Sequence, residues 1–80
     1  MESKIAVIAI IVSDKAAAFR INELLHEFGE YVIGRMGLPY KERNISVISV
    51  VIDAPQEIIN SLSGKLGMID GVKSKVLTAK

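Results

Sequence analysis

The 80-residue sequence contains no cysteine, no tryptophan and only four aromatic side chains. Without cysteine, the chain forms no disulfide and offers no thiolate as a metal ligand or nucleophile. A domain of this length buries only about 60–65% of the surface that its unfolded chain exposes, so its own core is marginal. Because no disulfide can compensate, we expect a single domain over residues 1–80 that gains stability from another subunit.

Neither sign of charge is in large excess, since the formal net charge is only +1. This value is too small to indicate binding to nucleic acid or to an anionic membrane. The apolar run Ile5–Val12 lacks a signal-peptide context and is far shorter than the roughly 20 residues that span a bilayer. We therefore expect a cytoplasmic protein with no direct nucleic-acid partner and no membrane partner.

Candidate catalytic and metal-binding residues are few. His26 is the only histidine, and a single His without Cys needs carboxylates or a second chain to complete a metal site. The serines have no base close to them in the sequence that could activate a hydroxyl. We therefore predict no catalytic residue, no metal and no cofactor.

The apolar pattern predicts four strands and two helices. Residues 44–53 are apolar on both alternations, and so are residues 4–12, which is typical of central strands. Residues 30–38, which we expect Pro39 to end, and residues 72–78 contain glycines or charges typical of edge strands. One helix is expected over residues 15–28, capped by Ser13–Asp14 and stopped by Gly29. The second begins at Ala54–Pro55, with Asp53 or Ala54 as its cap, and ends at Gly67.

The order β-α-β-β-α-β predicts an α+β fold, a ferredoxin-like sandwich whose antiparallel sheet has the order 4-1-3-2. Right-handed crossovers place both helices on one face of the sheet. The other face would then be an apolar surface of several hundred Å², which is unusual on a soluble monomer. We therefore expect a homo-oligomer, a dimer or a tetramer, joined through the sheet face or a sheet edge.

Three basic residues, Arg35, Lys41 and Arg43, surround the expected connection between the second and third strands. They could gather at a subunit interface and hold an anion, which makes Arg35 a candidate ligand-binding residue. The alternative is a solvated loop beside an edge strand that its charges protect from pairing with other chains.

Three stretches of the chain resemble one known family: Arg20–His26, Ile33–Pro39 and Leu62–Val72. Together they are similar to the proteins described as regulators of the iron-only hydrogenase system, over essentially the whole chain. The third stretch, a helix end followed by Leu-Gly-x-Ile-x-Gly-Val, is shared more loosely with ACT-like domains and with the C-terminal domain of the nickel-responsive repressor. The resemblance implies a single ACT-like domain that senses a small ligand and forms oligomers.

The resemblance also implies a place for the ligand. ACT-like domains often bind ligands, commonly amino acids, at subunit interfaces near the loop after the first strand, and the matching positions are Ser13 and Asp14. The repressor's nickel chemistry does not transfer, because its several His ligands and one Cys ligand are matched here by His26 alone. Because the first strand begins by Lys4, we expect no ribbon-helix-helix DNA-binding domain, so any control of transcription would act through a partner chain.

Several functions stay open at this point. The first is a non-enzymatic regulatory or ligand-sensing oligomer linked to the iron-only hydrogenase system, with Ser13, Asp14 and Arg35 as its site. The second is a structural protein–protein interaction module that has no ligand of its own. A third, a small acylphosphatase-like enzyme, is disfavoured because Val12–Lys15 stands where that family has a glycine-rich anion-binding loop with an arginine.

Overall fold

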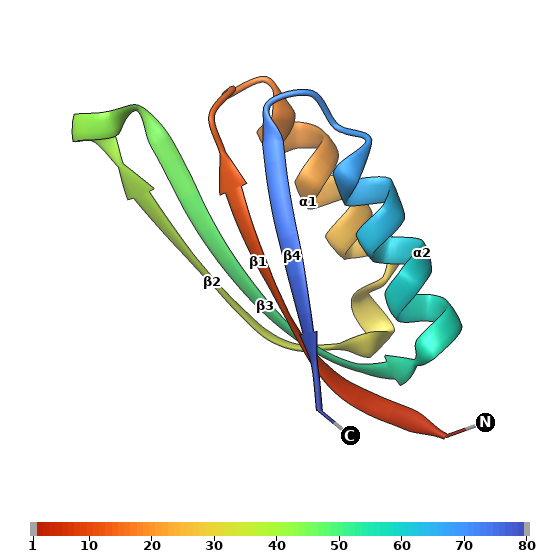
Figure 1. The fold of residues 1–80 in the computed structure, drawn as a ribbon. Helices are drawn as coiled ribbons and strands as arrows, with labels where there is room; N and C mark the ends of the chain where they lie inside the picture. The colour runs from red at the N-terminus through yellow and green to blue at the C-terminus, as the bar shows by residue number, and fades with distance from the viewer. Residues whose placement is uncertain (1, 80) are drawn as a thin grey trace.

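The computed structural model describes residues 2–79, and within them it contains four strands and two helices (Figure 1). In chain order these elements are β1 (Ser3–Val12), α1 (Ala17–Glu27), β2 (Val32–Tyr40), β3 (Ile45–Pro55), α2 (Gln56–Gly67) and β4 (Val72–Thr78). Two short 3-10 turns, η1 (Gly29–Tyr31) and η2 (Lys41–Arg43), lead from α1 to β2 and from β2 to β3.

The strands form one antiparallel sheet in the order β2-β3-β1-β4. This is the predicted order 4-1-3-2 counted from the other edge, and it confirms the ferredoxin-like α+β fold. Figure 1 shows α1 and α2 on the same face of the sheet, as right-handed crossovers require. Within residues 2–79, no element covers the opposite face.

The hydrophobic core lies between the sheet and the two helices. Successive side chains of a strand project to opposite faces, so every second residue of β1 and β3 points toward the helices. The helices contribute their apolar stripes from the other side. The most deeply buried residues include Ala6, Ile8 and Ile10 of β1, Val50 and Ile52 of β3, Ile21 and Leu24 of α1, and Ile59, Leu62 and Leu66 of α2.

The ends of β2 and β3 differ from the prediction. β2 continues through Pro39 instead of ending before it. A proline is tolerated there because β2 is an edge strand, which needs ladder hydrogen bonds on one side only. β3 is also longer, since its pairing with β1 extends to the pair Ser3–Pro55. Pro55 is therefore the N-cap of α2, in place of the predicted Asp53 or Ala54.

Helix α1 is shorter than predicted at both ends. Its N-cap is Ala16, and no side chain makes a capping hydrogen bond. Asp14 shapes the preceding turn instead, because its Oδ1 accepts a 2.9 Å hydrogen bond from the backbone N–H of Ala16. At the other end Phe28 is the C-cap, and Gly29 does not stop the helix but opens the 3-10 turn η1.

Candidate ligand-binding groove

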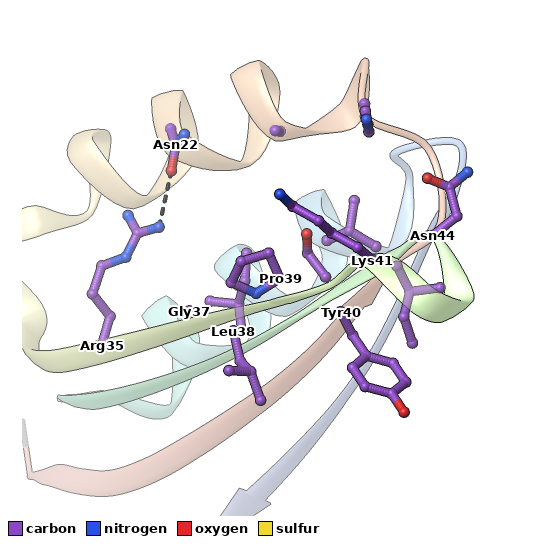
Figure 2. Close-up of a pocket in the computed structure, with 14 residues that line it drawn as sticks. Asn22, Arg35, Gly37, Leu38, Pro39, Tyr40, Lys41 and Asn44 are labelled. Atoms are coloured by element: carbon purple, nitrogen blue, oxygen red, sulfur yellow. Dashed lines mark hydrogen bonds between the residues drawn. The ribbon is translucent and has the colours of Figure 1, made fainter.

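A groove of about 680 Å³ lies between α1 and the β2–β3 hairpin (Figure 2). The hairpin projects past the part of the sheet that the helices cover, so the helix and the hairpin form two separate walls (Figure 1). Lys15, Ala18 and Asn22 line the groove from the side of α1. The hairpin supplies the opposite wall, and its polar contribution begins with Arg35 of β2 and continues to Ser46 of β3.

The pairing of β2 with β3 decides which hairpin residues face the helix. Arg35 and Gly37 lie opposite Val50 and Ile48, which are buried beneath the helices. Directly paired residues share a face of the sheet, so the side chain of Arg35 projects toward α1. Leu38 belongs to the other alternation, and Figure 2 shows its side chain pointing away from the helix.

One hydrogen bond joins the two walls. Nη2 of Arg35 donates to Oδ1 of Asn22 at 2.9 Å and so links β2 to α1 (Figure 2). A guanidinium has five N–H donors, so this bond leaves others for a ligand. Because Asn22 is neutral, it orients Arg35 without cancelling its charge.

The charged residues of the groove all have the same sign. Lys15, Arg35 and Lys41 line it together with the amides Asn22 and Asn44. Within residues 2–79, no Asp or Glu is among the lining residues. Cations on facing walls create a local positive potential even though the formal net charge of the chain is only +1. Such an arrangement can attract and hold a small anion.

Small residues keep the groove open, and two core residues form its base. A Cβ placed on Gly37 would meet nothing within 4 Å, so this side of β2 has room for a bound group. Val12 and Ile48 are only 5% and 9% exposed and give the groove an apolar base. Pockets for small organic molecules commonly combine apolar surface with a few placed polar groups in this way.

Of the three predicted ligand-binding residues, Arg35 lines the groove, whereas Ser13 and Asp14 lie in the loop between β1 and α1. Ser13 contacts Gly71, in the turn before β4: its Oγ donates to the carbonyl oxygen of Gly71 at 3.2 Å, and its backbone N–H donates to the same oxygen at 2.8 Å. Asp14 packs against the same glycine. Ser13 and Asp14 thus lie together at a contact between two loops, and their role in ligand binding stays a prediction.

Sequence reasoning missed Lys15, Asn22 and Asn44. Lys15 and Asn22 fall outside the apolar stripe of the expected helix, which is also true of ordinary solvated residues. Asn44 has a positive φ of 54°, a conformation in which Asn is enriched, and it follows the charged connection of the hairpin. That position indicates a turn but not a ligand site, because only the folded chain brings the hairpin opposite α1.

Other kinds of site find less support in the part of the chain that the structure describes. No group of three or more His, Cys, Asp or Glu residues there is placed to hold a metal ion, and His26 is exposed. Nor does any helix there have the length and apolar character needed to cross a membrane.

The uncovered face of the sheet is a second surface of interest. Apolar side chains from several strands are exposed on it: Ile11 is 46% exposed, Met36 69% and Leu77 74%. Lys73 pairs opposite Ile11 and adds a charge at the β4 edge. An apolar centre with a charged margin is typical of a surface that binds another protein.

Sequence comparison establishes the family. Residues 4–76 match the model of the TM1266-like family, which is described as "Iron-only hydrogenase system regulator, putative". The chain belongs to the TM1266-like family. This result confirms the predicted resemblance, which also covered essentially the whole chain. Among functionally curated proteins, no sequence matches this TM1266-like chain.

A solved structure agrees with the family assignment of the TM1266-like chain. The uncharacterized protein TM1266 from Thermotoga maritima is 40% identical, with a TM-score of 0.93. The match covers 99% of this chain and 100% of that one.

More distant structures share the fold of the TM1266-like chain. A formyltetrahydrofolate deformylase from Pseudomonas putida KT2440 is 11% identical with a TM-score of 0.66, and the match covers 91% of this chain but 28% of that one. Another such structure is CPII, a nitrogen regulatory PII-like protein from Thiomonas intermedia K12 bound to ADP, AMP and bicarbonate. It is 16% identical with a TM-score of 0.55, and the match covers 96% of this chain and 96% of that one.

Proposed function

We propose that this TM1266-like chain is a non-enzymatic regulatory module that senses a small ligand, built as a single ACT-like domain over residues 1–80. The observation that supports the proposal is the groove between α1 and the β2–β3 hairpin, which offers polar donors beside an apolar base. The family description, which names a regulator, points in the same direction. The chain would respond to a metabolite and pass that response to a partner.

The system that we propose it regulates is the iron-only hydrogenase system, because the family description names that system. The compartment that we propose is the cytoplasm. The sequence has no Cys, whereas small secreted domains usually depend on disulfides.

The fold relatives guide the choice of compounds to test. CPII structures contain ADP and AMP, together with bicarbonate in one case and acetate in another. Amino acids join this panel because the resemblance to ACT-like domains implies them.

Thermal unfolding with each compound tests the sensing function. A ligand that binds only the folded state adds RT ln(1 + [L]/Kd) to its stability, about 2.7 kcal/mol at a concentration of 100 Kd. We expect at least one compound to raise Tm by several degrees, since about 1 kcal/mol moves the Tm of a domain this small by roughly 4–8 °C. If no compound moves Tm at millimolar concentration, ligand sensing by this chain is wrong.

A blocking variant checks that the ligand enters the groove. Gly37→Val directs a side chain from the helix-facing side of β2 into the open space of the groove. The variant should fold, because the added Cβ meets nothing within 4 Å and Val favours strands. It should also lose the Tm response, and a full response in this variant would place the ligand elsewhere.

The uncovered sheet face favours a second function, a structural interaction module. We propose that a second copy of the chain covers this face and that the protein is a homo-oligomer, a dimer or a tetramer. The exposed apolar residues on the face support this proposal. Light scattering after gel filtration measures the native mass, and a stable monomer at micromolar concentration would contradict self-association.

A further inference from the structure

We propose that the groove binds a small organic anion bearing a carboxylate or phosphate group, held by Lys15, Arg35 and Lys41. The proposal deepens the ligand-sensing function above and rests on it. It names the chemical class of the ligand and the side chains that recognise it.

The three groove cations come from separate segments of the chain. Lys15 precedes α1, Arg35 lies in β2, and Lys41 opens η2. Figure 2 shows Lys41 extending over the groove from the hairpin side. Their convergence is a product of the fold and costs repulsion between like charges. An anion bound between the two walls would offset this repulsion, because each cation attracts it.

Two cations elsewhere in the described chain have carboxylate partners. Arg20 pairs with Glu23 at 2.6 Å, and Lys65 lies 3.7 Å from Glu27. Within residues 2–79, no ion pair involves any of the three groove cations. The described lining of the groove also contains no Asp or Glu, whereas charges of both signs are mixed on an ordinary solvated surface.

Arg35 is the residue best suited to select the ligand. A guanidinium presents a planar set of donors that can bind a carboxylate or a phosphate through two parallel hydrogen bonds. The 2.9 Å bond to Asn22 already holds Arg35 in place, which lowers the entropy cost of binding. Lys15 and Lys41 add mobile point charges, which suit a second anionic group or a polyphosphate.

The size and base of the groove favour an organic anion over other charged partners. A volume of about 680 Å³ lies within the range of roughly 300–1,000 Å³ that is typical of small-molecule sites. The apolar base of Val12 and Ile48 can contact the carbon part of such a ligand. A nucleic acid is disfavoured, because the net charge is only +1 and the three groove cations line a small groove and not an extended basic surface.

Isothermal titration calorimetry with matched compounds tests the ligand class. ADP and adenosine share a base and a sugar but differ in phosphate, while citrate supplies carboxylates and inorganic phosphate supplies the bare anion. We expect ADP or citrate to bind and adenosine not to bind. The ADP and citrate arms distinguish phosphate from carboxylate recognition. Affinity should fall several-fold as salt rises from low to high ionic strength, because the attraction to exposed cations is screened.

Charge-removing variants test the site. Arg35→Gln and Lys41→Gln should each weaken anion binding at least about tenfold, since each removes a charge-assisted hydrogen bond. Arg43→Gln is the matched control, because Arg43 lies in η2 like Lys41 but does not line the groove. The affinity of this variant for the anion should stay within about twofold of the wild-type value. Arg35→Lys keeps the charge but loses the planar guanidinium, so its affinity for the anion should lie between those of Arg35→Gln and the wild type. Circular dichroism confirms folding, and the exposed Lys41 supplies the test if Arg35→Gln does not fold.

The outcomes distinguish the anion proposal from the ligand-sensing function on which it rests. If adenosine binds as tightly as ADP, the anion class is wrong but the sensing function stands. If anions bind equally well to the wild type and to both charge-removing variants, the groove is the wrong site. If neither these compounds nor the earlier panel binds, the anion proposal and the sensing function both fail.

Discussion

Gly71 is a residue at which the backbone requires glycine. Its φ is +80°, where residues with a side chain are rarely found. A Cβ at this position would also lie 2.5 Å from the Cβ of Asp14. The carbonyl oxygen of Gly71 accepts both hydrogen bonds from Ser13. The close approach of Gly71 thus ties the loop after β1 to the turn before β4.

Replacing two glycines by alanine should have opposite effects on stability. We expect Gly71→Ala to lower the free energy of unfolding by about 1–3 kcal/mol, because it adds backbone strain and a steric clash. Gly64→Ala should raise it by about 0.8–1 kcal/mol, since Gly64 lies within α2 and an added Cβ meets nothing within 4 Å. Urea unfolding followed by circular dichroism measures both values. A Gly71→Ala variant as stable as the wild type would show that the turn relaxes freely.

Among the elements, β1 shows most clearly how one strand serves two surfaces. Ile8 and Ile10 are fully buried under the helices, whereas Ile5 and Ile11 on the other alternation are 42% and 46% exposed. The sequence predicted two apolar faces for this strand but did not show which one the helices cover. The crossover connections made that choice, because they put both helices on one side of the sheet.

Truncating one residue on each face of β1 should lower the free energy of unfolding by unequal amounts. Ile8→Ala should cost about 2–5 kcal/mol of unfolding free energy, as expected for a cavity in a packed core. Ile11→Ala should cost about 0.5 kcal/mol in the isolated chain, because half of its side chain already contacts water. Thermal unfolding over a range of protein concentrations measures both. A loss for Ile11→Ala that grows with concentration would mean that another copy covers the residue.

For the whole molecule, the distribution of its apolar surface matters most. One sheet face is sealed by α1 and α2, and the other exposes apolar side chains from several strands. A chain this small has a marginal core, so burying the second face would add stability that the helices alone do not supply.

Placing a charge on the uncovered face should separate the subunits. Val47 is 37% exposed there, so Val47→Lys should leave a lone chain folded but should bury a charge in a face-to-face oligomer. We expect its native mass, measured by light scattering, to fall to that of a monomer. Phe19→Lys is the control, because Phe19 is 76% exposed on α1, away from this face, and its variant should keep the wild-type mass. If both variants keep the native mass of an oligomeric wild type, the subunits contact one another at the sheet edges and not through this face.

The hydrophobic pattern was enough to predict the order of elements, the central position of β1 and β3, and the ferredoxin-like sheet. These features depend on the two-residue period of strands and the 3.6-residue period of helices, which are local properties. Helix and strand ends were less accurate, as at Pro39 and Pro55, because ladder pairing with a neighbouring strand extends or ends a segment whatever its own residues favour.

The candidate site depended on tertiary structure. Arg35 was selected from the sequence as a basic residue near a hairpin, but its hydrogen bond to Asn22 and its place opposite Lys15 arise only when α1 packs beside β2. A groove is a space between elements, and no local pattern encodes its shape. The amino-acid sequence by itself therefore determined which segments form strands and helices, whereas the packing of α1 against the sheet decided which cations face one another.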